Sequence, residues 1–366
     1  MKKSNRILLV IVSVCIVSGG TAFGVLILST WGSVPYENTF YYKPNTPSLI
    51  EQININCDIG SIRINYNETP TDYYAQIDLD IRIKGMLVEG KSFQDFFYPI
   101  IWQNESSQII SFILDAKAST WLTFSISQRV NINLILRTDI IYDLNAHTST
   151  GSIKMDIPNN SILNNTILST STGSVSLNVA EQTNFLGDVD ISTSTGSVEL
   201  YAKHTDFTQS LNAHTSTGSL KLNFSNSKIG KNFIGKCSTG SIKFNSYNMK
   251  YSDDYNWDLT TSTGSIDVNI IQYVEITAKV NGAIKTSTGS INVEYKDNSI
   301  NIGAKFTAST STGSIDYEPI GFGGFIESGS STSKVIISDD YDSAINLYIL
   351  SLTTSTGSIE VNGENL

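Results

Sequence analysis

The 366-residue sequence contains few of the residues from which catalytic and metal sites are built. Three cysteines exclude a disulfide scaffold, and three histidines leave little material for metal or acid–base chemistry. Only 16% of the residues are charged, and the 24 Lys and Arg residues are mostly scattered. Nucleic-acid binding needs clustered cations to neutralise phosphates. We therefore expect a protein that is not an enzyme, holds no cofactor and binds no nucleic acid.

Proline is scarce as well, at seven residues, whereas glycine is frequent at 26 and the formal net charge is −10. Ile, Val, Tyr and Phe are abundant, and with so little charge they argue against intrinsic disorder. These residue types favour β-strands. The composition therefore indicates a β-rich protein with a polar, weakly acidic surface.

One long hydrophobic run lies near the N-terminus, from Ile7 to Trp31. It is long enough to cross a hydrocarbon core of ~30 Å as a helix. Lys2, Lys3 and Arg6 precede the run and no charge follows until Glu37, so the N-terminus should stay in the cytosol. We expect a single-pass protein of the cell membrane whose remainder is extracytoplasmic.

Five segments follow from this pattern: residues 1–6 as a cytosolic tip, 7–31 as a transmembrane signal anchor, 32–49 as a juxtamembrane linker, 50–143 as a β-rich lead-in or cap, and 144–366 as a repeat region. The alternative for the N-terminus is a signal peptide cleaved near the small residues Ser18–Ala22. The apolar run resumes after that point, which favours an uncleaved anchor.

From Thr148 onward one phrase recurs, T-S-T-G-S followed by Ile, Val or Leu. Its glycines are spaced by 22–25 residues, except for one gap of 44 in which Ser333 replaces the glycine. A fixed period of this length indicates stacked units that bury their apolar faces against one another. The repeat glycines are Gly151, Gly173, Gly196, Gly218, Gly240, Gly264, Gly289, Gly313 and Gly357.

The residues around each glycine alternate as in a strand with one buried face. In the first copy Ile153 and Met155 are apolar and Lys154 between them is polar, and every copy keeps this order. Apolar residues stand at odd distances before the glycine and at even distances after it. We therefore expect the glycine to form a corner with a left-handed backbone. The fold class is therefore all-β: a parallel β-solenoid of about ten rungs, with one N-terminal transmembrane helix.

An N-terminal anchor, a strand-rich lead-in and serial T-S-T-G-S-I rungs together resemble the "putative-adhesin" β-solenoid family of bacterial and archaeal envelope proteins. The resemblance covers roughly residues 50–366. It implies a β-solenoid at the membrane or cell surface. It brings no catalytic residues and no ligand.

The paired threonines of each phrase have two interpretations. If both faced solvent on a flat sheet, they would form an array like that of ice-binding solenoids. The alternation of the strand favours threonines that face inward and whose hydroxyls form hydrogen bonds to the neighbouring rung. The pairs are Thr148/Thr150, Thr170/Thr172, Thr193/Thr195, Thr215/Thr217, Thr261/Thr263, Thr286/Thr288 and Thr310/Thr312.

Histidine and cysteine fall at equivalent repeat positions. His147 and His214 lie three rungs apart, about 14 Å, which is too far to share a metal ion. Cys57 and Cys237 belong to distant rungs, so we expect two buried thiols and no disulfide. His204 has no evident partner.

An acidic cluster offers a weak calcium site, formed by Asp339, Asp340 and Asp342. Its spacing matches no recognised calcium loop, so we expect no resident metal. Pairs of carboxylates could also serve carbohydrate cleavage, but no pair recurs with a supporting Arg or Lys.

We expect a non-catalytic surface element, structural or adhesin-like, that presents polar files and loops to a glycan or protein. The loops that depart most from the repeat are Pro158–Asn165, Ser246–Asp254 and Ile320–Thr332. The alternative is an envelope module that binds or modifies carbohydrate. We also expect residues 352–366 to leave an open strand edge that promotes self-association.

Overall fold

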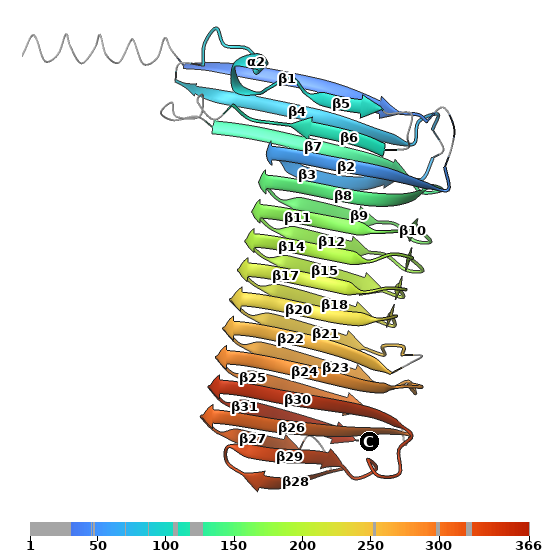
Figure 1. The fold of residues 1–366 in the computed structure, drawn as a ribbon, viewed down its shortest axis with the longest axis vertical. Coiled ribbons are helices and arrows are strands. Elements are labelled where there is room, and N and C mark those ends of the chain that lie inside the picture. The colour runs from blue at the N-terminus through green and yellow to red at the C-terminus, as the bar shows by residue number, and fades with distance from the viewer. Residues whose placement is uncertain are drawn as a thin grey trace, which may run out of the picture.

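The structure is a computed structural model that describes residues 31–44, 46, 48–69, 71–86, 88–104, 109–117, 127–251, 254–297, 301–319 and 324–365. These residues form one elongated stack of strands that lie across the long axis (Figure 1). Two long sheets make the sides of the stack, and a short third sheet runs along one edge.

The first sheet has 13 strands. In spatial order they are β1 (Trp31–Tyr42), β4 (Ala75–Met86), β7 (Ser127–Arg137), β3 (Ser61–Asn67), β9 (Ile153–Ile157), β12 (Val175–Val179), β15 (Val198–Lys203), β18 (Leu220–Ser225), β21 (Ile242–Tyr247), β23 (Ile266–Gln272), β25 (Ile291–Asp297), β31 (Ile359–Asn365) and β27 (Ile315–Pro319).

The second sheet has 14 strands. In spatial order they are β28 (Phe325–Ser330), β29 (Ser333–Ser338), β26 (Ile302–Thr312), β30 (Asn346–Thr356), β24 (Lys279–Thr288), β22 (Tyr255–Thr263), β20 (Asn232–Thr239), β17 (Leu211–Thr217), β14 (Val189–Thr195), β11 (Thr166–Thr172), β8 (Ile141–Thr150), β2 (Ile50–Ile59), β6 (Ile109–Leu114) and β5 (Ile101–Asn104).

The third sheet has four strands of two residues each and lies at the turns that lead from the first sheet back to the second. Its strands are β10 (Ile162–Leu163), β13 (Asn184–Phe185), β16 (Asp206–Phe207) and β19 (Lys228–Ile229). A single short helix, α2 (Phe93–Phe96), appears in the described part of the chain.

Alternation within each strand builds the core between the two long sheets. In β12, Val175 and Leu177 are fully buried and Ser176 between them is not. The parallel register places Leu177 opposite Leu200 of β15, so equal positions of successive rungs form one apolar column. Burying each such side chain stabilises the fold by about 1.5–3 kcal/mol. The prediction of an all-β fold with parallel rungs is confirmed.

The repeat glycines are the corners between the two sheets, as predicted. Gly151 has φ +148°, a backbone conformation that side chains disfavour. A Cβ atom on Gly151 would lie 2.0 Å from the carbonyl oxygen of Gly60, the corner of the neighbouring rung. Each corner therefore requires glycine for two reasons: its backbone conformation and the close approach of the next rung.

Antiparallel strands close the N-terminal end of the stack. Strand β1 pairs with β4, and β4 pairs with β7. The expectation of a linker over residues 32–49 is therefore wrong for residues 32–42, which belong to β1. Val34 and Tyr42 of this strand are buried. Pro35 lies on β1, an edge strand of the first sheet, which is where sheets tolerate proline.

At the other end, the chain order of the rungs is rearranged. Strand β30 lies between β24 and β26, and β31 lies between β25 and β27 (Figure 1). The last repeat in sequence is thus inside the stack. The expected open edge over residues 352–366 is wrong, and self-association through it loses its structural basis.

A hairpin of β28 and β29 covers the outermost rung instead. Strand β29 runs antiparallel to β26, which ends the parallel ladder. The ring of Phe325 packs against Tyr295, Phe306 and Tyr317. The copy that lacks its glycine, around Ser333, lies in this hairpin, where no corner is required.

Within the described residues, no helix combines the length and apolar character that a membrane span requires. The expected anchor, residues 7–31, lies outside these residues except for Trp31, which begins β1.

Candidate functional site

A file of left-handed residues marks the turns on one edge of the solenoid. Five residues spaced 22 positions apart have φ between 47° and 61°: Asn160, Gln182, His204, Asn226 and Asn248. Backbone hydrogen bonds tie the file together, for example from the N–H of Gln182 to the carbonyl of His204 at 2.9 Å. This turn file is a continuous, hydrogen-bonded feature of the stack.

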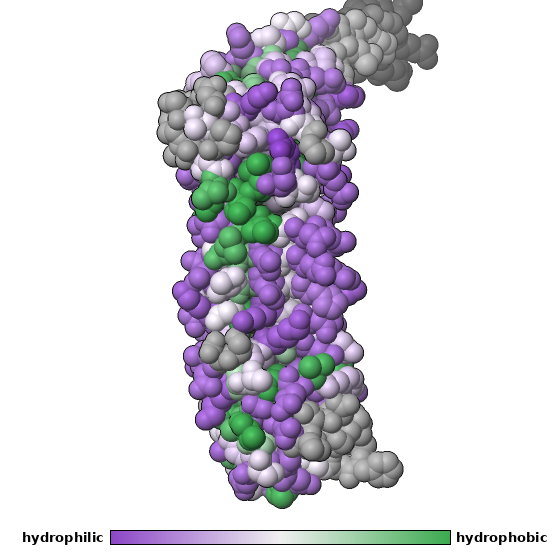
Figure 2. Space-filling view, turned by 90° about the vertical axis from the view of Figure 1, so that its right-hand side faces the viewer, coloured by the Kyte–Doolittle hydropathy of each residue, from purple (hydrophilic) through white to green (hydrophobic). Residues whose placement is uncertain are grey.

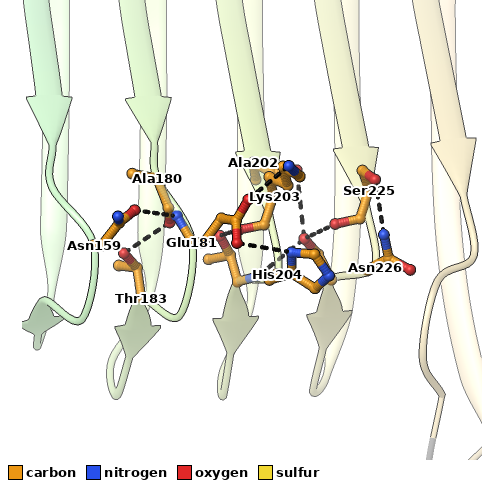
Figure 3. Close-up of polar contacts among 11 residues, drawn as sticks. Asn159, Ala180, Glu181, Thr183, Ala202, Lys203, His204, Ser225 and Asn226 are labelled. Atoms are coloured by element: carbon orange, nitrogen blue, oxygen red, sulfur yellow. Dashed lines mark hydrogen bonds and ion pairs between the residues drawn. The ribbon is translucent and has the colours of Figure 1, made fainter.

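A groove of about 480 Å³ lies beside the turn file and is lined by Glu181, Gln182, Asn184, His204, Asp206 and Lys250. Glu181 reaches from one turn to the next, where its carboxylate contacts the ammonium of Lys203 at 2.6 Å and Nδ1 of His204 at 3.6 Å (Figure 3). We call this the turn groove.

The electrostatics of the turn groove follow from this pairing. The hydrogen bond from Lys203 holds the pKa of Glu181 below its usual value. Glu181 is therefore ionised at neutral pH and accepts hydrogen bonds. The expectation that His204 lacks a partner is wrong, because stacking brings Glu181 of the previous rung beside it.

The outward residues of the third sheet continue this surface. Asn184 pairs with Asp206, Asp206 with Lys228, and Lys228 with Lys250. Apolar side chains gather on the upper part of the same face (Figure 2). Ile162 and Leu186, which belong to the first two turns of this sheet, are 40% and 42% exposed. The turn face is thus mixed, with an apolar end and a charged groove.

The structure separates the two threonines of each phrase. Thr170 is buried, and its hydroxyl donates a hydrogen bond of 2.8 Å to the carbonyl oxygen of Gly151. Thr172 is exposed at the edge of the corner. The same inward bond recurs at Thr148, Thr193, Thr215, Thr261, Thr286, Thr310 and Thr354.

The inward interpretation of the threonines is therefore correct for the first threonine of each pair and wrong for the second. The ice-binding alternative requires both threonines on one flat face, and the described rungs do not provide it.

Cys57 and Cys237 are buried free thiols, as predicted. Cys237 takes the place of an inward threonine, with its sulfur 3.2 Å from the carbonyl oxygen of Gly218. Burial raises the pKa of the Cys57 thiol to about 11 and also raises that of Cys237. Both thiols remain protonated at neutral pH and have structural roles.

The two equivalent histidines stay apart. Nδ1 of His147 lies 2.9 Å from the hydroxyl of Ser169, and His214 pairs in register with Ser192 and Lys236. Neither histidine belongs to a group of metal ligands within the described residues.

Among the acidic candidates, Asp340 accepts a hydrogen bond of 2.6 Å from Ser338 at the turn after β29. The described residues contain no group of three His, Cys, Asp or Glu side chains that could hold a metal ion, and this includes Asp339 and Asp342.

The three loops expected to make contacts differ in kind. Pro158–Asn165 is a regular turn of the third sheet and contains β10. Ser246–Asp254 and Ile320–Thr332 each include residues outside the described part of the chain. The rest of the latter contains β28 and the turn that leads into β29.

Sequence reasoning missed the turn file. Its signal was present, because a large polar residue, usually Asn, stands eight or nine residues after each of five corner glycines. Those positions fall in the variable connections between strands, where the repeated phrase gives no guidance.

No protein-family model matches the chain, and no curated protein is significantly similar to it. Among solved structures, the chain is similar to a "putative cell adhesion protein" from Clostridium sporogenes, with 14% identity, a TM-score of 0.24, and coverage of 90% of this chain and 99% of that one.

Two further solved structures are described as a "putative adhesin". One, from Bacteroides fragilis, has 11% identity and a TM-score of 0.35, with coverage of 89% of this chain and 96% of that one. The other, from Parabacteroides merdae, has 10% identity and a TM-score of 0.42, with coverage of 89% and 95%. These values assign neither a family nor a function to this chain.

Proposed function

We propose that this protein is a membrane-anchored β-solenoid on the outer side of the cell membrane. Its role would be structural and adhesin-like, as implied by the family that its repeats resemble. In this proposal the stack is a rigid rod, the N-terminal segment anchors it, and the turn groove binds a ligand. The protein performs no chemistry on that ligand.

One observation carries the proposal: Gln182 and His204 hold left-handed backbone conformations and both line the turn groove. Glycine would adopt this conformation without strain, and asparagine tolerates it well. Three of the five turn-file positions are Asn. The two larger side chains coincide with the groove, and strained residues of this kind cluster at binding sites.

The chemistry of the turn groove suits a carbohydrate. It combines the carboxylates of Glu181 and Asp206 with the amides of Gln182 and Asn184. Such groups donate and accept hydrogen bonds with sugar hydroxyls. A general acid needs a carboxyl that holds its proton near neutral pH, whereas the pKa of Glu181 is lowered. This favours binding over cleavage.

The test is a glycan-array experiment on the full chain in a non-ionic detergent, with a parallel assay for released reducing sugar. The variant Gln182→Gly with His204→Gly removes both side chains and relieves the backbone. The matched control, Asn160→Gly with Asn226→Gly, makes the same change at file positions that do not line the groove.

We expect glycan binding by the native chain and the control, at least a tenfold loss in the groove variant, and thermal stability at or above the native value in both. Equal losses in both variants, or no bound glycan, would contradict the proposal. Release of reducing sugar would replace it with the carbohydrate-modifying alternative.

A further inference from the structure

A hollow of about 590 Å³ lies on the outer face of the first sheet, where β7, β3 and β9 run side by side (Figure 1). Three cations line it: Arg63 from β3, Arg129 from β7 and Lys154 from β9. No carboxylate is among the lining residues. We call it the basic hollow, and it is unexpected in a chain with a net charge of −10.

We propose that the basic hollow is a binding site for an anionic glycan, one that carries phosphate, sulfate or carboxylate groups on a saccharide. The site lies on another face from the turn groove, and it does not rest on the function proposed above.

Strand register places like charges side by side in the basic hollow. Arg63 pairs directly with Lys154, and both side chains are exposed. Like charges opposite one another on neighbouring strands are destabilising. The flanking positions in the same row are Asn133 and Ser176, so no carboxylate flanks the two cations within that row. Lys154 has an ion-pair partner, Asp156, two residues away on its own strand.

A second like-charged pair on the same sheet is arranged differently. Lys221 pairs with Lys243, but Glu199 flanks the first and Asp267 flanks the second. That pair is balanced within its own row. It provides a matched control for the Arg63–Lys154 pair of the basic hollow, which has no flanking carboxylate in its row.

Two carboxylates beside the basic hollow form ion pairs with two of its three cations. Asp156 contacts Lys154 at 3.0 Å and accepts a hydrogen bond from Asn178. Asp80 contacts Arg129 at 3.6 Å and Arg82 at 3.2 Å.

Arg63 has no carboxylate within 4.0 Å in the described part of the chain. Its guanidinium can therefore bind an external oxyanion with two parallel hydrogen bonds.

The remaining side chains identify the class of ligand. The hollow adds the amides of Asn65, Asn131 and Asn133 and the hydroxyls of Ser61 and Ser152. Asn65 already donates a hydrogen bond of 2.8 Å to Asn133, and the remaining polar atoms of these groups can hydrogen-bond to sugar hydroxyls. No aromatic side chain lines the hollow, which removes the stacking platform that single-stranded nucleic acid uses. Its two isoleucines are buried, so no apolar side chain is available to enter a bilayer.

The experiment measures binding of the full-length chain, in a non-ionic detergent, to immobilised dextran sulfate and to uncharged dextran at two salt concentrations. The test variant is Arg63→Gln with Lys154→Gln, and the control is Lys221→Gln with Lys243→Gln. Both remove two positive charges from outward positions of the first sheet, so both should keep the fold, which the far-ultraviolet spectrum and melting curve check. Binding to vesicles with phosphatidylglycerol forms a second arm.

We expect binding to dextran sulfate but not to dextran, a decrease of at least tenfold in the test variant and of less than twofold in the control. Failure to bind dextran sulfate, or equal losses in both variants, would overturn the site. Equal or tighter binding to vesicles, with the same dependence on Arg63 and Lys154, would overturn the glycan assignment in favour of a lipid headgroup. These outcomes do not depend on the turn groove. They stand whether or not the Gln182→Gly and His204→Gly variant loses its glycan.

Discussion

The hydroxyl of Thr354 donates a hydrogen bond of 2.9 Å to the carbonyl oxygen of Gly289, 65 residues earlier in the chain. Thr310, which is nearer to Gly289 in sequence, donates instead to Gly357. The final repeat is therefore inserted between two earlier ones. The copies around Gly289, Gly313 and Gly357 carry the same threonine and glycine, so the inserted rung makes the contacts that an ordinary neighbour would make.

This insertion predicts which cysteine pairs can be cross-linked. Lys285 is paired with Thr353, and Thr353 is paired with Ser309. Neighbouring strands lie about 4.8 Å apart, within reach of a disulfide, whereas strands two apart lie about 9.6 Å apart. Under mild oxidation, Lys285→Cys with Thr353→Cys should form a disulfide detected by mass spectrometry. Lys285→Cys with Ser309→Cys should not, and the reverse result would mean that the rungs stack in chain order.

The corner glycines should tolerate no side chain. A Cβ atom at Gly218 would lie 1.8 Å from the carbonyl oxygen of Gly196, and φ is +147°. We expect Gly218→Ala to lower the free energy of unfolding by more than about 3 kcal/mol, because steric overlap adds to backbone strain. Urea denaturation provides the measurement.

Gly90 allows the effect of backbone strain to be measured without steric overlap. It has φ +75° and no atom within 4 Å of a Cβ position. Gly90→Ala should cost only about 1–2 kcal/mol. Similar losses at both glycines would mean that rung-to-rung contact does not require glycine.

The inward hydroxyl of each rung should contribute to stability. Thr215→Val keeps the shape but leaves the carbonyl oxygen of Gly196 without its 2.9 Å hydrogen bond. We expect a loss of about 1–3 kcal/mol. Cys237→Thr restores the repeat residue beside Gly218 and should leave the urea midpoint unchanged or raise it. A marked loss in the cysteine variant would contradict this account of the inward file.

The turn groove should show a lowered carboxyl pKa that depends on Lys203. The ammonium favours the ionised form of Glu181, so its folded-state pKa lies below the ordinary value. The ion pair is therefore complete above the ordinary Glu pKa and is lost as the pH falls through the folded-state value. In a carbon-13 NMR titration, Lys203→Met should raise the pKa of Glu181. An unchanged pKa would mean that the pair does not form in solution.

The sequence alone predicts the corner glycines, the inward columns and the buried thiols. These features belong to the repeated phrase, and the alternation of each strand decides which side chains face inward. Thr170 and Gly151 illustrate this, because a two-residue period and one corner suffice to place the inward side chain of Thr170 and the corner at Gly151.

The inserted rung could not be predicted. The copies around Gly289, Gly313 and Gly357 are nearly interchangeable, so several stacking orders satisfy the same local pattern. Strand β1 was missed for another reason: it contains Pro35, which a sheet tolerates at an edge, and only the sheet order shows that β1 is an edge strand. The basic hollow brings Arg63 and Arg129 together from different strands, and only the sheet order relates them.

Labelling of a surface cysteine on intact cells tests the central claim, surface display of the rod, most directly. Ser194 is exposed on the second sheet, and the native thiols Cys57 and Cys237 are buried. In a Cys15→Ser background, Ser194→Cys should react with a membrane-impermeant maleimide on intact cells as fully as after lysis, while the background chain stays unlabelled. Reaction only after lysis would contradict the display of this solenoid outside the membrane.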